Sequence, residues 1–281
     1  MRSSKFDICF AAVAVSLATA VLAARELKPA TLAAYERYVA LTEQRIAQEN
    51  DGARPFLWVD QQPAPARDTV MRRLRNGEVV VERLETRDEG KSIRISGGLI
   101  HHWVGTVLLP DVPVDRAVAF VQDYDRYSQL FDPIMPRVRV LEHDGDRYVV
   151  AMRTAFTKVV TVVMDGDYVI TYHRLSPSRV WTTNVATNLF QVHDAGTPNE
   201  RREPGDAASG YLWRYSMYCK FEQRAEGSLD QCESVTLTRD VPFAIAWLVR
   251  PFVTGIPRDA MTFTLGRVRA ALASQSGTPA R

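Results

Sequence analysis

Alternating apolar and polar positions dominate the second half of the chain and predict a run of antiparallel strands. Between these stretches lie short segments rich in Gly, Asp and Ser, which are typical of hairpin turns. An antiparallel sheet of this kind buries at least one face, so it needs a covering element. The expected strands are 99–109, 137–142, 147–156, 159–172, 179–192, 211–223 and 231–240, with a bulge or turn at 165–167.

Helical periodicity appears instead near the two ends of the chain. In 27–48, apolar residues recur at steps of three and four, with charged residues between them. In the last helix, Met261, Leu265 and Val268 share one face. Shorter helices are expected at 68–74, after the Asp-Val-Pro of 111–113, and at 124–130.

This element order predicts an α+β helix-grip architecture, in which a curved antiparallel sheet wraps around a long C-terminal helix. The space between the sheet and that helix is the natural ligand site. A helical and extended segment, 25–96, is expected to pack on the main domain, 97–273. The segment 194–209 is expected to be a solvated loop, and 274–281 a flexible tail.

The N-terminus has the layout of a secretory signal. Arg2 and Lys5 precede an almost wholly apolar run, 8–24, that ends in small residues. An uncleaved membrane anchor remains open, because the run approaches the minimum length for crossing a bilayer. The small residues at its end favour cleavage. The sequence therefore predicts a signal peptide over 1–24 and a periplasmic or secreted protein.

Composition and charge narrow the partners and cofactors. Apolar residues make up 46% of the chain, enough for a sizeable core, and the net charge of +2 gives no reason to expect nucleic acid. No cofactor and no metal site are expected, and the protein is expected to be a monomer. Removal of the leader would leave Cys219 and Cys232, which fit either a disulfide or two separate buried thiols. Arg153, Arg214 and Arg239 are expected mostly to face outward and form cross-strand ion pairs.

The segment 120–131 resembles the helix pair of the START-like superfamily, also called the polyketide cyclase and lipid-transport superfamily. Its tyrosine-bearing turn leads to Phe131 and Pro133, and the segments 100–103, 212–214 and 232–242 resemble a secreted bacterial branch of the same superfamily. The resemblance covers 97–272. It implies a helix-grip cavity for lipids, sterols or other apolar molecules, and some members are aromatases or cyclases.

Candidate ligand-binding residues follow from the expected walls of that cavity. Aromatic and apolar residues alternate along 211–223, so Trp213, Tyr215 and Met217 are expected to share a face. That face is either a packed core or a cavity wall, and Met261, Leu265 and Val268 would form the opposing wall. His101 and His102 point to opposite faces of a strand, so they cannot chelate a metal together. The pair fits one surface His and one buried, hydrogen-bonded His better than a ligand site, and His102 is the candidate if one of them faces the cavity.

The stretch 241–256 is rich in apolar residues and is broken by prolines. It fits a helix-turn packed on the domain, or a lid that touches a membrane transiently, with Trp247 at the lipid interface. In both cases it is too short to span a bilayer. Trp247 is therefore a further candidate for contact with a ligand.

The sequence leaves three functions to compare. The leading hypothesis is binding, and in a wider version transport, of a hydrophobic or lipid-like small molecule. The alternative is a cyclase or dehydratase with His102, Tyr215 or Arg214 as acid–base groups. The third is an interaction module whose interior is filled by its own side chains. The chain has no Gly-x-Ser-x-Gly or His-Glu-x-x-His motif to indicate hydrolysis.

Overall fold

A computed structural model describes residues 27–157, 161–207, 210–240 and 243–275, and for 243–254 it describes the helical backbone alone. The expected leader, 1–24, and residues 276–281 of the expected tail lie outside the described residues.

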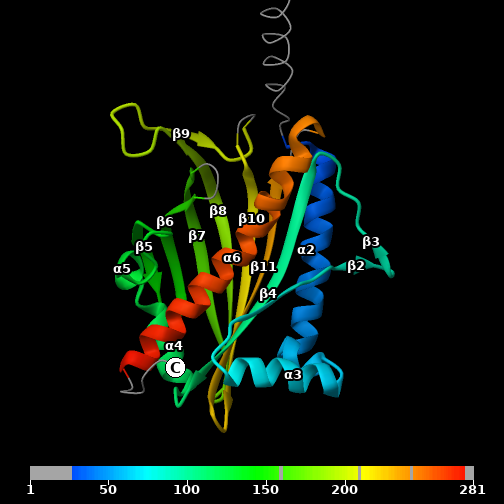
Figure 1. Ribbon diagram of the computed structural model, residues 1–281, viewed down its shortest axis with the longest axis vertical. Helices are drawn as coiled ribbons and strands as arrows, with labels where there is room; N and C mark the ends of the chain where they lie inside the picture. Colours follow the sequence, from blue (N-terminus) through cyan, green and yellow to red (C-terminus); the bar gives the residue numbers. More distant parts are fainter. Residues whose placement is uncertain (1–26, 158–160, 208–209, 241–242, 276–281) are drawn as a thin grey trace, which may run out of the picture.

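One large antiparallel sheet forms the centre of the molecule (Figure 1), and it confirms the α+β prediction. Its strands follow the order β1-β4-β11-β10-β8-β7-β6-β5, with β9 paired to β8. The strands are β1 (Val80–Arg83), β4 (Gly98–Pro110), β5 (Arg137–Asp144), β6 (Arg147–Thr157), β7 (Thr161–Ser176), β8 (Arg179–His193), β9 (Arg201–Pro204), β10 (Leu212–Arg224) and β11 (Gly227–Arg239).

The C-terminal helix α6 (Phe243–Gln275) lies across one face of this sheet, as expected (Figure 1). Gly105 of β4 allows the close approach, because a Cβ atom there would lie 2.5 Å from the Met261 sulfur. Met261, Leu265 and Val268 are buried in the main core. The sheet and α6 therefore form the predicted grip.

The front segment covers the opposite face of the sheet. It contains α2 (Pro29–Asn50), the 3₁₀ turn η1 (Trp58–Gln61), α3 (Ala64–Arg75) and the short hairpin β2 (Arg87–Asp88) and β3 (Lys91–Ser92). Tyr35 and Tyr38 of α2 pack against Val235 and Leu237 of β11. The segment also supplies β1, which pairs with β4, so the main sheet begins before residue 97.

Two expectations about irregular segments are wrong. The loop 194–209 contains β9, whose backbone pairs with β8 from Phe190 to His193. The described part of the stretch 241–256 does not form a separate helix-turn: α6 runs without interruption from Phe243, through Pro251 and Pro257. The helices α4 (Val114–Gln122), η2 (Tyr124–Arg126) and α5 (Tyr127–Leu130) occur where the sequence predicted helix.

Candidate functional site

A pocket of about 270 Å³ lies between α6 and the sheet. It is lined by alternate residues of β6, β7, β8, β10 and β11, by one side of α6, and by the helical segment that precedes β5. Period-two alternation explains this lining, because every second side chain of a strand points to the same face. Most of the lining is apolar, including Phe131, Ile134, Met135, Met152, Phe156, Val162, Met164, Ile170, Leu212, Phe221, Ile256 and Ala260.

Tyrosines line the pocket beside α4 and α5. The hydroxyls of Tyr124 and Tyr172 are hydrogen-bonded to each other at 2.8 Å, and Tyr127 donates to the Val121 carbonyl at 2.6 Å. Burial raises the pKa of all three phenols above the ordinary value. These groups therefore remain neutral at physiological pH, and their own hydrogen bonds hold them in place.

A disulfide between Cys219 and Cys232 crosses from β10 to β11 within the pocket lining. The two residues are directly paired in the sheet register, and both side chains point toward the pocket. Of the two alternatives that the sequence left open, the structure contains the disulfide. It replaces two thiols with an apolar bridge.

Asp230 of β11 is the site residue that the sequence analysis missed. Among the described residues that line the pocket, it alone carries a carboxyl, amino, guanidinium or imidazole group. Burial raises the pKa of its carboxyl to about 7. The available signal was the alternation of Asp230 with Cys232, Ser234 and Thr236, but the predicted strand began one residue later, at 231.

Five of the eight predicted ligand residues line the pocket. They are Tyr215, Met217, Met261, Leu265 and Val268. The expectation that Trp213 shares their face is wrong, because the register shifts between Leu212 and Arg214. This irregularity turns Trp213 to the other side of the sheet, where it packs with Tyr35 and Tyr38. The Trp247 side chain lies outside the described residues.

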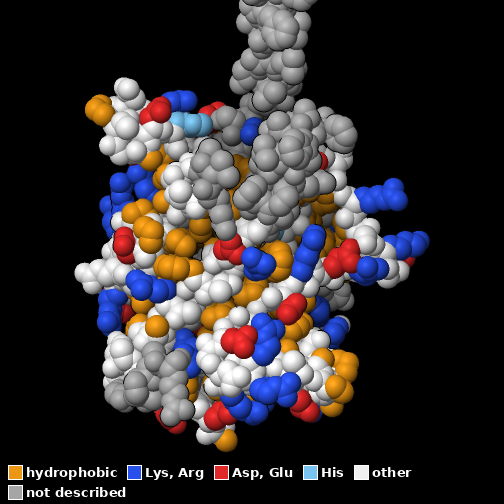
Figure 2. All heavy atoms as spheres, in the orientation of Figure 1, with side chains coloured by type: hydrophobic (Ala, Val, Ile, Leu, Met, Phe, Trp, Pro, Cys, Tyr) orange, Lys and Arg blue, Asp and Glu red, His pale blue; other side chains and the backbone are white. Residues whose placement is uncertain are grey.

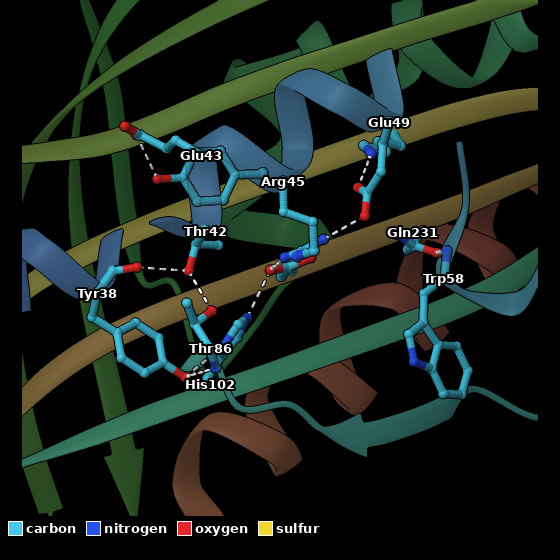
Figure 3. Close-up of polar contacts among 12 residues, drawn as sticks. Tyr38, Thr42, Glu43, Arg45, Glu49, Trp58, Thr86, His102 and Gln231 are labelled. Carbon is cyan, nitrogen blue, oxygen red and sulfur yellow. Dashed lines mark hydrogen bonds and ion pairs between the residues drawn. The ribbon is translucent and has the colours of Figure 1, made fainter. Parts of the chain in front are cut away.

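His102 also lies on the far side of the sheet from the pocket. Its Nε2 is 2.7 Å from the Glu233 carboxylate, and its Nδ1 is 2.8 Å from the Tyr38 hydroxyl (Figure 3). The Tyr38 hydroxyl in turn accepts a hydrogen bond from the Thr86 backbone N–H. His102 therefore joins α2 to the sheet and does not contact the pocket. The adjacent His101 is also buried and contacts Thr238 at 2.8 Å.

Charged residues extend this network along α2. Arg45 bridges Glu49 and Glu233, and Lys220 donates to Glu49 at 2.6 Å (Figure 3 labels Arg45 and Glu49). Burial raises the pKa of the Glu233 carboxyl, but the His102 hydrogen bond and the Arg45 charge together lower it below the ordinary value. Each of Arg45, Glu49, Lys220 and Glu233 has a partner of opposite charge in this network, as the cost of desolvation requires. The network fixes the front segment on the sheet.

The proposed acid–base groups do not meet in one place. Of His102, Tyr215 and Arg214, only Tyr215 lines the pocket. Arg214 donates to the Trp213 carbonyl at 2.7 Å and pairs with Asp206. The expected cross-strand pairing holds for Arg153, which binds both Asp165 and Glu200.

Metal sites, membrane-spanning helices and charged surface patches are the other features that could indicate a function. In the described ranges, no His, Cys, Asp and Glu side chains group in a way that could hold a metal ion. Likewise, none of the helices described there is long and apolar enough to cross a bilayer. Figure 2 shows acidic and basic side chains interspersed over the face that carries α6.

Comparisons with known proteins return similarity only among solved structures. No family model matches the chain, and no curated protein matches it. A STAR-related lipid transfer protein from Xanthomonas axonopodis is 15% identical, with a TM-score of 0.45 over 68% of this chain and 98% of that one. The Zhui aromatase/cyclase from a Streptomyces species is 12% identical, with a TM-score of 0.44 over 64% and 100%. Human STARD10 is 11% identical, with a TM-score of 0.41 over 77% and 84%. The chain, whose sheet and α6 form a helix grip, is similar at low identity to these START-domain and aromatase/cyclase structures.

Proposed function

We propose that this protein binds a small hydrophobic molecule in the pocket between α6 and the sheet. The observation that carries the proposal is the pocket itself, with its predominantly apolar lining. Its volume of about 270 Å³ lies just below the usual range for small-molecule sites, which starts at about 300 Å³. That size suits one acyl chain or a compact ring system better than a lipid with two chains.

The affinity would come mainly from burial of apolar surface. A guest that buries roughly 300 Å² gains about 7 kcal/mol at ~25 cal/mol per Å². The loss of translational and rotational freedom on binding reduces that gain. We therefore expect dissociation constants in the micromolar range or weaker for simple apolar probes.

The proposed place of action is outside the cytoplasm, in the periplasm or the medium. The Cys219–Cys232 disulfide supports this, since structural disulfides persist in oxidising compartments. The apolar run 8–24 supports it independently. Expression of the full chain in a bacterium tests the proposal. We expect osmotic shock to release an oxidised protein that lacks the leader, and deletion of 1–24 to retain a reduced protein in the cytoplasm.

Two matched variants of α6 test binding in the pocket. Ala260 lines the pocket, whereas Ala270 is exposed on the same helix. The Ala260→Phe variant should fill the pocket and weaken binding of N-phenyl-1-naphthylamine at least tenfold in a fluorescence titration. Ala270→Phe should bind the probe like the wild type. Equal affinities for all three proteins would contradict the proposal.

Native mass spectrometry gives a second test without a chosen probe. Protein purified from its own cell envelope should carry an added mass that denaturation releases, and Ala260→Phe should carry less of it. Transfer of the probe between donor and acceptor vesicles would then distinguish a carrier from a protein that only binds.

A further inference from the structure

Asp230, the single carboxyl among the described residues of the pocket lining, has a position that a purely apolar ligand does not explain. Asp230 is 2% exposed, and its side chain faces the pocket. Its paired neighbours in the sheet are Phe221 and Val107, both buried and apolar. Burial of a carboxyl without a polar partner costs several kcal/mol, so an Asp at this position destabilises the fold.

The surroundings of Asp230 favour the neutral form of its carboxyl below about pH 7. One carboxylate oxygen lies 3.8 Å from the Cys232 sulfur, which carries no hydrogen in the disulfide. No described cation forms an ion pair with Asp230, and burial alone accounts for its raised pKa. Asp230 also interacts electrostatically with the Tyr127 phenol. Burial is the main cause of the raised pKa of Tyr127, and nearby charges, including that of Asp230, raise it further. A neutral carboxyl has one O–H donor free to bond a guest.

We propose that Asp230 is the polar anchor of the pocket and donates a hydrogen bond to a neutral hydroxyl or carbonyl oxygen of the ligand. This inference rests on the proposed function and specifies the ligand class: an apolar alcohol or ketone rather than a hydrocarbon or a carboxylate. An ionised ligand is disfavoured, because the described residues of the pocket lining include no cation to pair with its charge. Asp230 lies near the β10–β11 turn, so the oxygen would lie at that end of the guest.

The test uses naphthalene, 2-naphthol and 2-naphthoate, which share one ring system and differ in their polar group. Each competes with N-phenyl-1-naphthylamine at pH 6 for the wild type, Asp230→Asn, Asp230→Leu and Thr236→Val. Asn keeps a donor of nearly the same shape, whereas Leu removes it. Thr236 lies on the same strand and lines the pocket, and its hydroxyl has no partner among the described residues. It is therefore the competing candidate for the anchor, and the comparison decides which of the two side chains bonds the guest.

We expect the affinity ratio of 2-naphthol to naphthalene to fall about fivefold in Asp230→Leu, as for the loss of one hydrogen bond. Asp230→Asn and Thr236→Val should keep the wild-type ratio, and 2-naphthoate should bind the wild type more weakly than 2-naphthol. An unchanged ratio in Asp230→Leu, or a loss in Thr236→Val instead, overturns the anchor and leaves pocket binding intact. If no compound and no probe binds the wild type, the proposed function itself fails. Thermal melts of each variant establish that it is folded before titration.

Discussion

The Lys220 ammonium donates to the Glu49 carboxylate at 2.6 Å, in a layer between α2 and the sheet where both side chains are almost fully buried. Burial lowers the pKa of Lys220, and the Glu49 charge partly offsets that effect. This pair joins residues 171 positions apart, so it ties the front segment to the main sheet.

Loss of one partner of this pair should cost more stability than loss of both. Lys220→Met leaves Glu49 buried with less compensation, and we expect it to lower the free energy of unfolding by about 3 kcal/mol. The double variant with Glu49→Leu should recover most of that loss. Urea denaturation measures both variants. The exposed pair of Arg37 and Asp88 is the control: Asp88→Asn should cost less than about 1 kcal/mol.

The disulfide should stabilise the hairpin that forms one wall of the pocket. Cys219 and Cys232 are 13 residues apart, and closing a loop of that size contributes about 3 kcal/mol in the chain-entropy model. The double variant Cys219→Ala/Cys232→Ala should unfold at correspondingly lower denaturant concentration. Reductant should shift the wild type in the same direction but not the double variant. If reductant does not change the denaturation midpoint of the wild type, and its mass corresponds to two free thiols, the bridge is refuted.

The same change, Gly to Ala, should have opposite effects on the two sides of the contact between α6 and the sheet. A Cβ at Gly105 would lie 2.5 Å from the Met261 sulfur and 2.8 Å from a Leu265 methyl group. We expect Gly105→Ala to destabilise the protein by about 1–3 kcal/mol through overpacking. At Gly266 the nearest atom would be 3.7 Å away, an ordinary contact. Gly266→Ala should therefore stabilise α6 by up to about 1 kcal/mol, which thermal melts would detect.

Asp230 should make the folded protein less stable as the pH rises from about 4 to about 7. Its carboxyl has a pKa of about 7 when folded, against an ordinary value of 3.8, so the native state binds the extra proton within this window. The stabilisation from this proton is fully present below pH 3.8 and is lost as the pH rises toward about 7. It contributes up to about 4 kcal/mol to the free energy of unfolding. Asp230→Asn should remove this slope and match the wild type more closely at pH 4 than at pH 8. Denaturant melts across that range give the comparison, and parallel curves for both proteins would exclude the assignment.

The sequence alone determined the elements and the side of the sheet to which most strand residues point. Period-two alternation in 211–223 placed Tyr215 and Met217 on the face that lines the pocket, and helical spacing placed Met261, Leu265 and Val268 opposite them. Both patterns are local, since they depend on backbone geometry within one element. The helix-grip order followed from the succession of these elements.

The tertiary structure decided what covers each face and where the local pattern breaks. A register shift after Leu212 turned Trp213 away from the pocket. The helix α2 covers the face of the sheet to which His102 points, so His102 contacts Tyr38 instead of a ligand. Asp230 became a site residue because β11 begins at Gly227, so that the strand carries Asp230 into the pocket lining. Register and covering depend on contacts between residues far apart in the chain, and no single-strand pattern contains that information.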